Sequence, residues 1–96
     1  MVTVRGNEAR FRFFRPTASR VDLAGDFNAW RTGQLRMSRG ADGTWEAALW
    51  LPKGTYEFAY FADGRWFVDY ASFGLQIGPF GPNGLLRIAP GARDAG

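Results

Sequence analysis

The 96-residue sequence predicts an all-β protein, an antiparallel β-sandwich of about seven short strands in a single domain covering residues 1–96. Apolar and polar residues alternate with period 2 along most segments, and no stretch has the 3.6-residue period of a helix. Turn signals built from Gly, Pro, Asp and Asn separate these segments. Aromatic residues make up 17% of the chain, which supplies large side chains for a compact core.

Period-2 alternation is clearest in the N-terminal half. Along residues 9–15, Phe11 and Phe13 share one face and two arginines share the other, as in a half-buried strand. Residues 20–24 alternate in the same way, and residues 25–28 (Gly-Asp-Phe-Asn) break the pattern. The remaining predicted strands cover residues 35–37, 44–51, 55–62, 65–69 and 85–89.

Turn chemistry predicts how these strands are joined. The pairs Asp42-Gly43 and Asp63-Gly64 are hairpin signals. Residues 71–84 hold four Gly and two Pro, and they are expected to form a long loop. Residues 90–96 are small and polar, and they are expected to be a short flexible tail.

A tight connection at residues 52–54 favours a hairpin in which Leu51 pairs with Tyr56. Leu49 would then face Phe58, and one side of the hairpin would be core. The other side should be polar if it meets water, but it is largely apolar. Its expected members form a candidate interaction face that a ligand, a partner or the following loop would cover: Ala48, Trp50, Ala59 and Phe61.

The composition excludes several kinds of chemistry. The chain has no Cys and no His, so disulfides, common zinc sites and Ser-His-Asp or Cys-His catalysis are not available. Glycoside hydrolysis needs two carboxylates on either side of a cleft, for which a small sandwich has little room. We therefore expect no catalytic residues, no metal and no cofactor.

The net charge is +3, which raises nucleic acid as a partner. The basic residues are spread out, however, and neither a basic run nor a nucleic-acid-binding motif is present. We therefore expect no nucleic-acid partner. We also expect no membrane partner, because no apolar stretch is as long as a membrane span. The N-terminus lacks the apolar segment of a signal peptide, so a cytoplasmic location is expected.

Five motifs follow one another in order between residues 10 and 89: Val21-Asp-Leu-Ala-Gly-Asp-Phe-Asn-Ala-Trp30, Asp42-Gly-Thr-Trp45, Leu51-Pro-Lys-Gly-Thr-Tyr-Glu-Phe58, Asp63-Gly-Arg-Trp66 and Gly78-Pro-Phe-Gly-Pro-Asn83. Together they resemble the glycogen- and starch-binding module at the N-terminus of isoamylases and glycogen-branching enzymes. The same module forms the glycogen-binding domain of the AMP-activated kinase β-subunit, and this chain resembles its standalone bacterial version. The resemblance implies an immunoglobulin-like (early-set) sandwich that binds α-glucans without catalysis.

The resemblance also implies which residues bind sugar. The family's stacking tryptophans correspond to Trp30 and Trp66, and its hydrogen-bonding Asn corresponds to Asn83. Indole rings stack on the C–H faces of sugars, and amides bind their hydroxyls. The family's Lys corresponds to Ala59, which offers no donor.

These residues also have structural interpretations. Trp30 could pack as a lid over its loop, and Asn83 could serve a turn. Asp26 and Asn28 are expected to bond turn backbone, and Trp45 is expected in the core. The alternative function is a sandwich without sugar binding that acts as a protein-interaction or dimerisation module through the face around Trp50.

Overall fold

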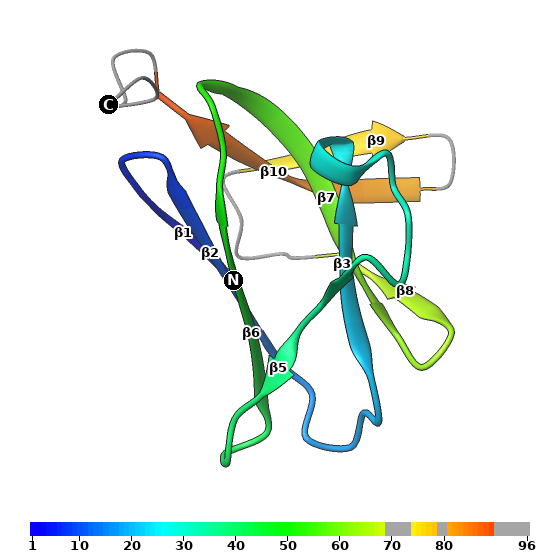
Figure 1. Ribbon diagram of the computed structural model, residues 1–96. Coiled ribbons are helices and arrows are strands. Elements are labelled where there is room, and N and C mark those ends of the chain that lie inside the picture. Colours follow the sequence, from blue (N-terminus) through cyan, green and yellow to red (C-terminus); the bar gives the residue numbers. More distant parts are fainter. Residues whose placement is uncertain (69–73, 79–80, 90–96) are drawn as a thin grey trace.

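The chain forms two antiparallel β-sheets packed face to face (Figure 1). The computed structural model describes residues 1–68, 74–78 and 81–89. The first sheet has the strand order β1-β2-β6-β5, and the second has the order β4-β3-β7-β10-β9, with β8 paired to β7. The strands are β1 (Val2–Arg5), β2 (Glu8–Phe14), β3 (Val21–Gly25), β4 (Leu35–Arg36), β5 (Ser38–Arg39), β6 (Thr44–Trp50), β7 (Gly54–Ala62), β8 (Arg65–Phe67), β9 (Gly74–Gly78) and β10 (Gly81–Ile88).

The prediction of an all-β, immunoglobulin-like antiparallel sandwich is confirmed. Within the described ranges the helical structure is one 3₁₀ turn, η1 (Asp26–Asn28). No helix among these residues has the length and apolar character to cross a membrane. The predicted tail at residues 90–96 lies outside the described residues.

Both predicted hairpin turns are present. At the β7–β8 turn, Ala62 pairs with Arg65 across Asp63 and Gly64, whose φ angles of 49° and 82° are the positive values that a tight two-residue hairpin needs. At the β5–β6 turn, the Asp42 carboxylate accepts a 3.0 Å bond from the Thr44 N–H. The turn residues therefore determine where these strands reverse.

The expected pairing of Leu51 with Tyr56 is wrong. Strand β6 pairs with β2 and β5, whereas β7 pairs with β3, β8 and β10. The connection at residues 52–54 thus carries the chain from the first sheet to the second. The inward-facing residues were nevertheless predicted correctly, because alternation determines which face a side chain takes but not which strand lies beside it.

Two regions contain strands that the sequence did not predict. Strand β1 pairs with β2 through a two-residue turn in which Gly6 has a φ of 60°. The expected long loop over residues 71–84 is wrong for its described part, since β9 and β10 form an antiparallel pair there. Gly and Pro disfavour strands, but β9 is at the edge of its sheet, and Pro82 lies in the part of β10 that precedes its pairing with β7 at Gly84.

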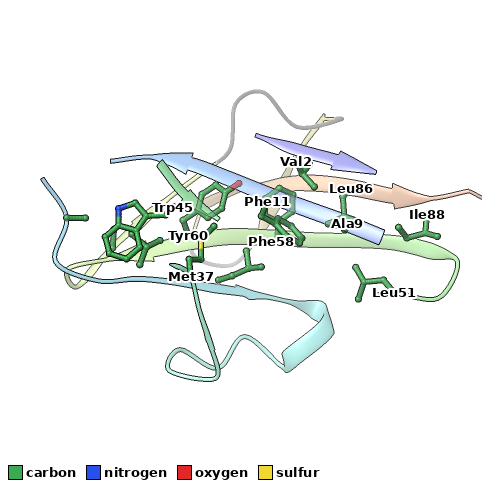
Figure 2. Packing of buried hydrophobic residues seen from close by; sticks show 14 residues of the cluster. Val2, Ala9, Phe11, Met37, Trp45, Leu51, Phe58, Tyr60, Leu86 and Ile88 are labelled. Carbon is green, nitrogen blue, oxygen red and sulfur yellow. The ribbon is translucent and has the colours of Figure 1, made fainter. Parts of the chain in front are cut away.

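The core lies between the sheets and is rich in aromatic rings (Figure 2). Phe11 from the first sheet meets Phe58 from the second edge to face, at 5.1 Å between ring centroids. Phe13 stacks on Tyr60 at 4.5 Å. Trp45 is buried, as predicted, and its indole N–H donates to the carbonyl of Arg15 at 2.9 Å. Each buried ring stabilises the fold by about 1.5–3 kcal/mol, so these rings hold the two sheets together.

Candidate functional site

The predicted sugar-binding residues gather on the outer face of the second sheet. Along β7, Phe58 and Tyr60 are buried in the core, so the alternating Glu57, Ala59 and Phe61 point to the other face. Trp66 of β8 lies directly beside Phe61 in the sheet. The outward side of β7 is therefore the floor of the candidate site.

Three aromatic rings form a contiguous group on this face, which we call the aromatic platform: Trp30, Phe61 and Trp66. The centroids of Trp30 and Trp66 are 6.1 Å apart, with ring planes inclined by 62°. Those of Phe61 and Trp66 are 4.8 Å apart. Trp66 is 49% exposed, and Trp30 is half-buried. The two tryptophans, 36 positions apart in the sequence, are thus brought together.

Trp30 is held by a hydrogen-bonded loop around η1. The Asn28 side chain accepts a bond from the N–H of Gly25 and donates to the carbonyls of Leu23 and Arg31. These bonds support a left-handed backbone at Ala29 and Trp30, with φ angles of 55° and 59°. Such conformations cost non-glycine residues about 1–3 kcal/mol each, which the loop contacts must offset. The expected structural role of Asn28 is confirmed.

Asp26 joins this loop to the sheet as well as to the ring. One carboxylate oxygen accepts a 3.1 Å bond from the Trp30 indole N–H, and the other accepts a 2.8 Å bond from the backbone N–H of Glu57. Gly25 lies so close to β7 that a Cβ there would be 2.5 Å from the carbonyl oxygen of Glu57. The expected bond from Asp26 to turn backbone is wrong, because its carboxylate accepts from the backbone of strand β7 and from the Trp30 indole instead.

Asn83 lies next to the platform and has a partner that the sequence did not reveal. Its amide donates to the Glu57 carboxylate at 3.2 Å. Gly84 pairs with Phe58, which places Asn83 next to Ala59 across β7 and β10. Glu57 shares the parity of Ala59 and Phe61, and this was the signal that could have found it. The pair supplies polar atoms beside the aromatic rings.

Ala59 occupies the floor between these polar and aromatic groups. It is 3% exposed although it faces outward, and its neighbour Ala24 on β3 is buried too. The methyl group therefore lies below the level of Glu57 and Phe61, its larger neighbours along the strand. No charged donor is present at this position.

The four residues expected to form one interaction face do not share a face. Ala48 and Trp50 lie on the outer face of the first sheet, whereas Ala59 and Phe61 lie on that of the second. The error follows from the wrong pairing of β6 with β7. Trp50 is 58% exposed, and its cross-strand neighbour is Glu8.

The surroundings of Trp50 are charged rather than aromatic. Arg10 is opposite Ala48, and Arg12 forms an exposed ion pair with Glu46 at 3.2 Å. Trp50 has no ring contact among the described residues. The first sheet thus presents one indole among charges.

The chemistry available at the site of the second sheet is stacking combined with hydrogen bonding. Within the described part of the chain, no three carboxylates are grouped so that they could hold a metal ion. The Asp26 carboxylate is engaged by the loop, and that of Glu57 by Asn83. Aromatic faces beside an amide and a carboxylate suit a ligand with both C–H and hydroxyl groups, which defines a binding module for carbohydrate.

Comparison with known families agrees with the assignment to carbohydrate-binding modules. Residues 2–77 match carbohydrate-binding module 48, the isoamylase N-terminal domain, and the chain belongs to that family. The chain is similar to the 1,4-alpha-glucan branching enzyme GlgB of Salinibacter ruber, with 32% identity over 72% of this chain and 11% of the enzyme. GlgB of Lactobacillus acidophilus is 36% identical over the same shares of each chain.

A plant protein is also similar. Protein PTST homolog 2, chloroplastic, of Arabidopsis thaliana is 40% identical over 55% of this chain and 10% of its own length. The match to each of these relatives spans about a tenth of the relative's length. The similarity therefore concerns the module and not the remainder of those proteins.

Proposed function

We propose that this protein binds α-glucans such as glycogen, starch or maltooligosaccharides without catalysing their conversion. The observation that carries the proposal is the contact between Trp30 and the exposed Trp66 on one sheet face. The family assignment supports a carbohydrate ligand, and the names of two relatives specify 1,4-alpha-glucan.

Sugar rings stack on Trp66 and Trp30, and Asn83 and Glu57 bond the hydroxyls. The indole planes are inclined by 62°, so the two rings do not lie under one flat ligand. This arrangement suits the curved chain of an α-glucan better than the straight, flat chain of a β-1,4-glucan. The Asp26 bond to the indole N–H fixes the Trp30 ring before the sugar arrives, which lowers the entropic cost of binding.

Affinity is low because Ala59 stands where the family pattern has Lys. A hydrogen bond to a charged group contributes about 1.5–3 kcal/mol, equivalent to roughly ten- to a hundredfold in affinity. Glu57 and Asn83 supply the polar contacts that remain beside this position. We therefore expect dissociation constants in the millimolar range for short oligosaccharides.

A calorimetric or fluorescence titration with maltohexaose tests the proposal, with cellohexaose as the matched control. The two sugars have the same units and length and differ in linkage. We expect saturable binding of maltohexaose and of the cyclic α-glucan β-cyclodextrin, and much weaker binding of cellohexaose. Absence of any response to millimolar maltohexaose would rule the proposal out.

A second candidate function is protein interaction or dimerisation through the face around Trp50. The observation that favours it is the 58% exposure of this indole on the first sheet. Exposed tryptophans are frequent anchors of protein interfaces. Sedimentation of the wild type and of Trp50→Arg at high concentration tests it: a dimer that the substitution dissociates supports self-association, and two identical monomers speak against it.

A further inference from the structure

An open pocket of about 450 Å³ lies beside the aromatic platform, at the end away from Asn83. Its walls come from the start of β3, from the connection between η1 and β4 and from the β7–β8 hairpin. The lining residues are Arg20, Asp22, Thr32, Gly33, Phe61, Asp63 and Gly64.

Phe61 belongs to both the pocket and the platform. Its ring lines the pocket and lies 4.8 Å from the Trp66 ring, which in turn contacts Trp30. Outward residues along β7 recur about every 7 Å, so Glu57, Ala59 and Phe61 form one line from the polar pair to the pocket. A chain lying on Trp66 and extended past Phe61 therefore enters the pocket.

A fixed ion pair forms the polar wall. Arg20 Nε and Nη2 donate to the two oxygens of Asp22 at 3.0 and 3.3 Å. Asp22 is 4% exposed, whereas nearly half of the Arg20 side chain is exposed. The pair uses two of the five guanidinium N–H donors and leaves three for ligand oxygens.

The pocket is also shaped and charged for a neutral ligand. Asp63 accepts bonds from the backbone N–H groups of Ser19 and Arg20, so its carboxylate fixes the wall. The lining holds one basic and two acidic side chains, a net charge of −1 that disfavours a phosphate group. Gly33 and Gly64 carry no side chain and leave the pocket open.

We propose that this pocket is a second subsite that takes a further unit of the same neutral glucan chain. This inference rests on the proposed function, since the sugar reaches the pocket from the platform. The Phe61 ring contacts the C–H face of the unit, and the Arg20 donors bond its hydroxyls. The pocket therefore makes affinity rise with chain length.

Two variants test the subsite. Thr32→Arg places a long side chain from an exposed loop position into the pocket and leaves the platform intact. Arg20→Lys keeps the charge but removes the planar fork, and it is the riskier variant because Asp22 is buried. Titration of ¹⁵N-labelled protein with maltotriose and with maltoheptaose follows the amides of Gly33 and Gly64 and the indole signals of Trp30 and Trp66.

In the wild type we expect maltoheptaose to shift the Gly33 and Gly64 amides and to bind more tightly than maltotriose. Thr32→Arg should lower the maltoheptaose affinity about tenfold and change maltotriose binding much less. The subsite is refuted, while the proposed function stands, if each sugar binds the wild type and Thr32→Arg with the same affinity and the amide signals of Gly33 and Gly64 do not shift. If maltoheptaose shifts none of the protein's signals, both the subsite and the proposed function fail. A shift of these amides by inorganic phosphate, and not by sugar, would also refute the subsite.

Discussion

Each sheet of the sandwich exposes a tryptophan on its outer face, but the two faces differ in what surrounds it. Trp66 on the second sheet contacts Trp30 and Phe61 and lies near the Asn83–Glu57 pair. Trp50 on the first sheet is more exposed, and its neighbours are Glu8, Arg10 and the Arg12–Glu46 ion pair. Exposure alone therefore does not identify a binding ring; the grouping of rings with fixed polar atoms does.

The largest effect should come from removing the exposed indole of the platform. We expect Trp66→Ala to weaken α-glucan binding by ten- to a hundredfold, because a stacking face and the support of Trp30 are both lost. Trp50→Ala makes the same change on the first sheet and should leave the affinity unchanged. Calorimetric titration of both variants with maltoheptaose measures the difference, and equal losses in the two would break the distinction between the faces.

The next effect concerns the loop that holds Trp30. Asn28→Ala removes one accepted and two donated hydrogen bonds, and we expect it to lower the free energy of unfolding by about 2 kcal/mol. Sugar affinity should fall as well, since the left-handed backbone at Trp30 loses its support. Urea denaturation and a maltoheptaose titration are both carried out on the wild type and on Asn28→Ala. Unchanged stability would show that Asn28 does not hold the loop.

A gain of affinity should follow from restoring the cation at the floor of the site. We expect Ala59→Lys to raise maltoheptaose affinity about tenfold through a charged hydrogen bond. The aliphatic stem of the new lysine has to pass the groups that cover Ala59, so the free energy of unfolding is measured in parallel. Ala48→Lys is the matched change on the first sheet and should have no effect. A stable Ala59→Lys variant that binds no better would mean that the site does not use a donor there.

The smallest effect is a pH dependence that belongs to the first sheet. The Thr44 backbone N–H, followed by its hydroxyl, donates to Asp42 and lowers the pKa of that carboxyl below its usual 3.8. The carboxylate therefore contributes stability that is fully present above about pH 3.8 and is lost as the pH falls through the lower folded pKa. Carboxyl ¹³C titration by NMR checks this direction, and Thr44→Val should keep most of the shift because the N–H remains. A pKa of Asp42 at or above 3.8 would contradict it.

The sequence predicted faces and turns well because these are local properties. Alternation placed Phe11, Phe58 and Tyr60 inward, and the Asp-Gly pairs marked where strands reverse. The family motifs placed Trp30 and Trp66 in one site, which their separation in the sequence would not suggest.

Pairing and polar contacts were harder, because they depend on which distant segments meet. Alternation is the same whether β6 and β7 pair or lie in opposite sheets, so the expected hairpin and its shared apolar face were wrong. The contact between Asn83 and Glu57 joins strands 26 residues apart, and the pocket combines three separate segments. Parity along β7 indicates that Glu57 faces the site, but no local pattern shows that Asn83 reaches it or that the pocket forms.

The most direct measurement is an NMR titration with maltoheptaose that follows the four indole N–H signals together. These report on both faces and on the core in one experiment, since Trp45 is buried and Trp50 lies on the first sheet. The signals of Trp30 and Trp66 should shift with a common dissociation constant while those of Trp45 and Trp50 stay in place. A shift of Trp50 without Trp30 and Trp66, or no shift of any indole at millimolar sugar, would contradict binding on the second sheet.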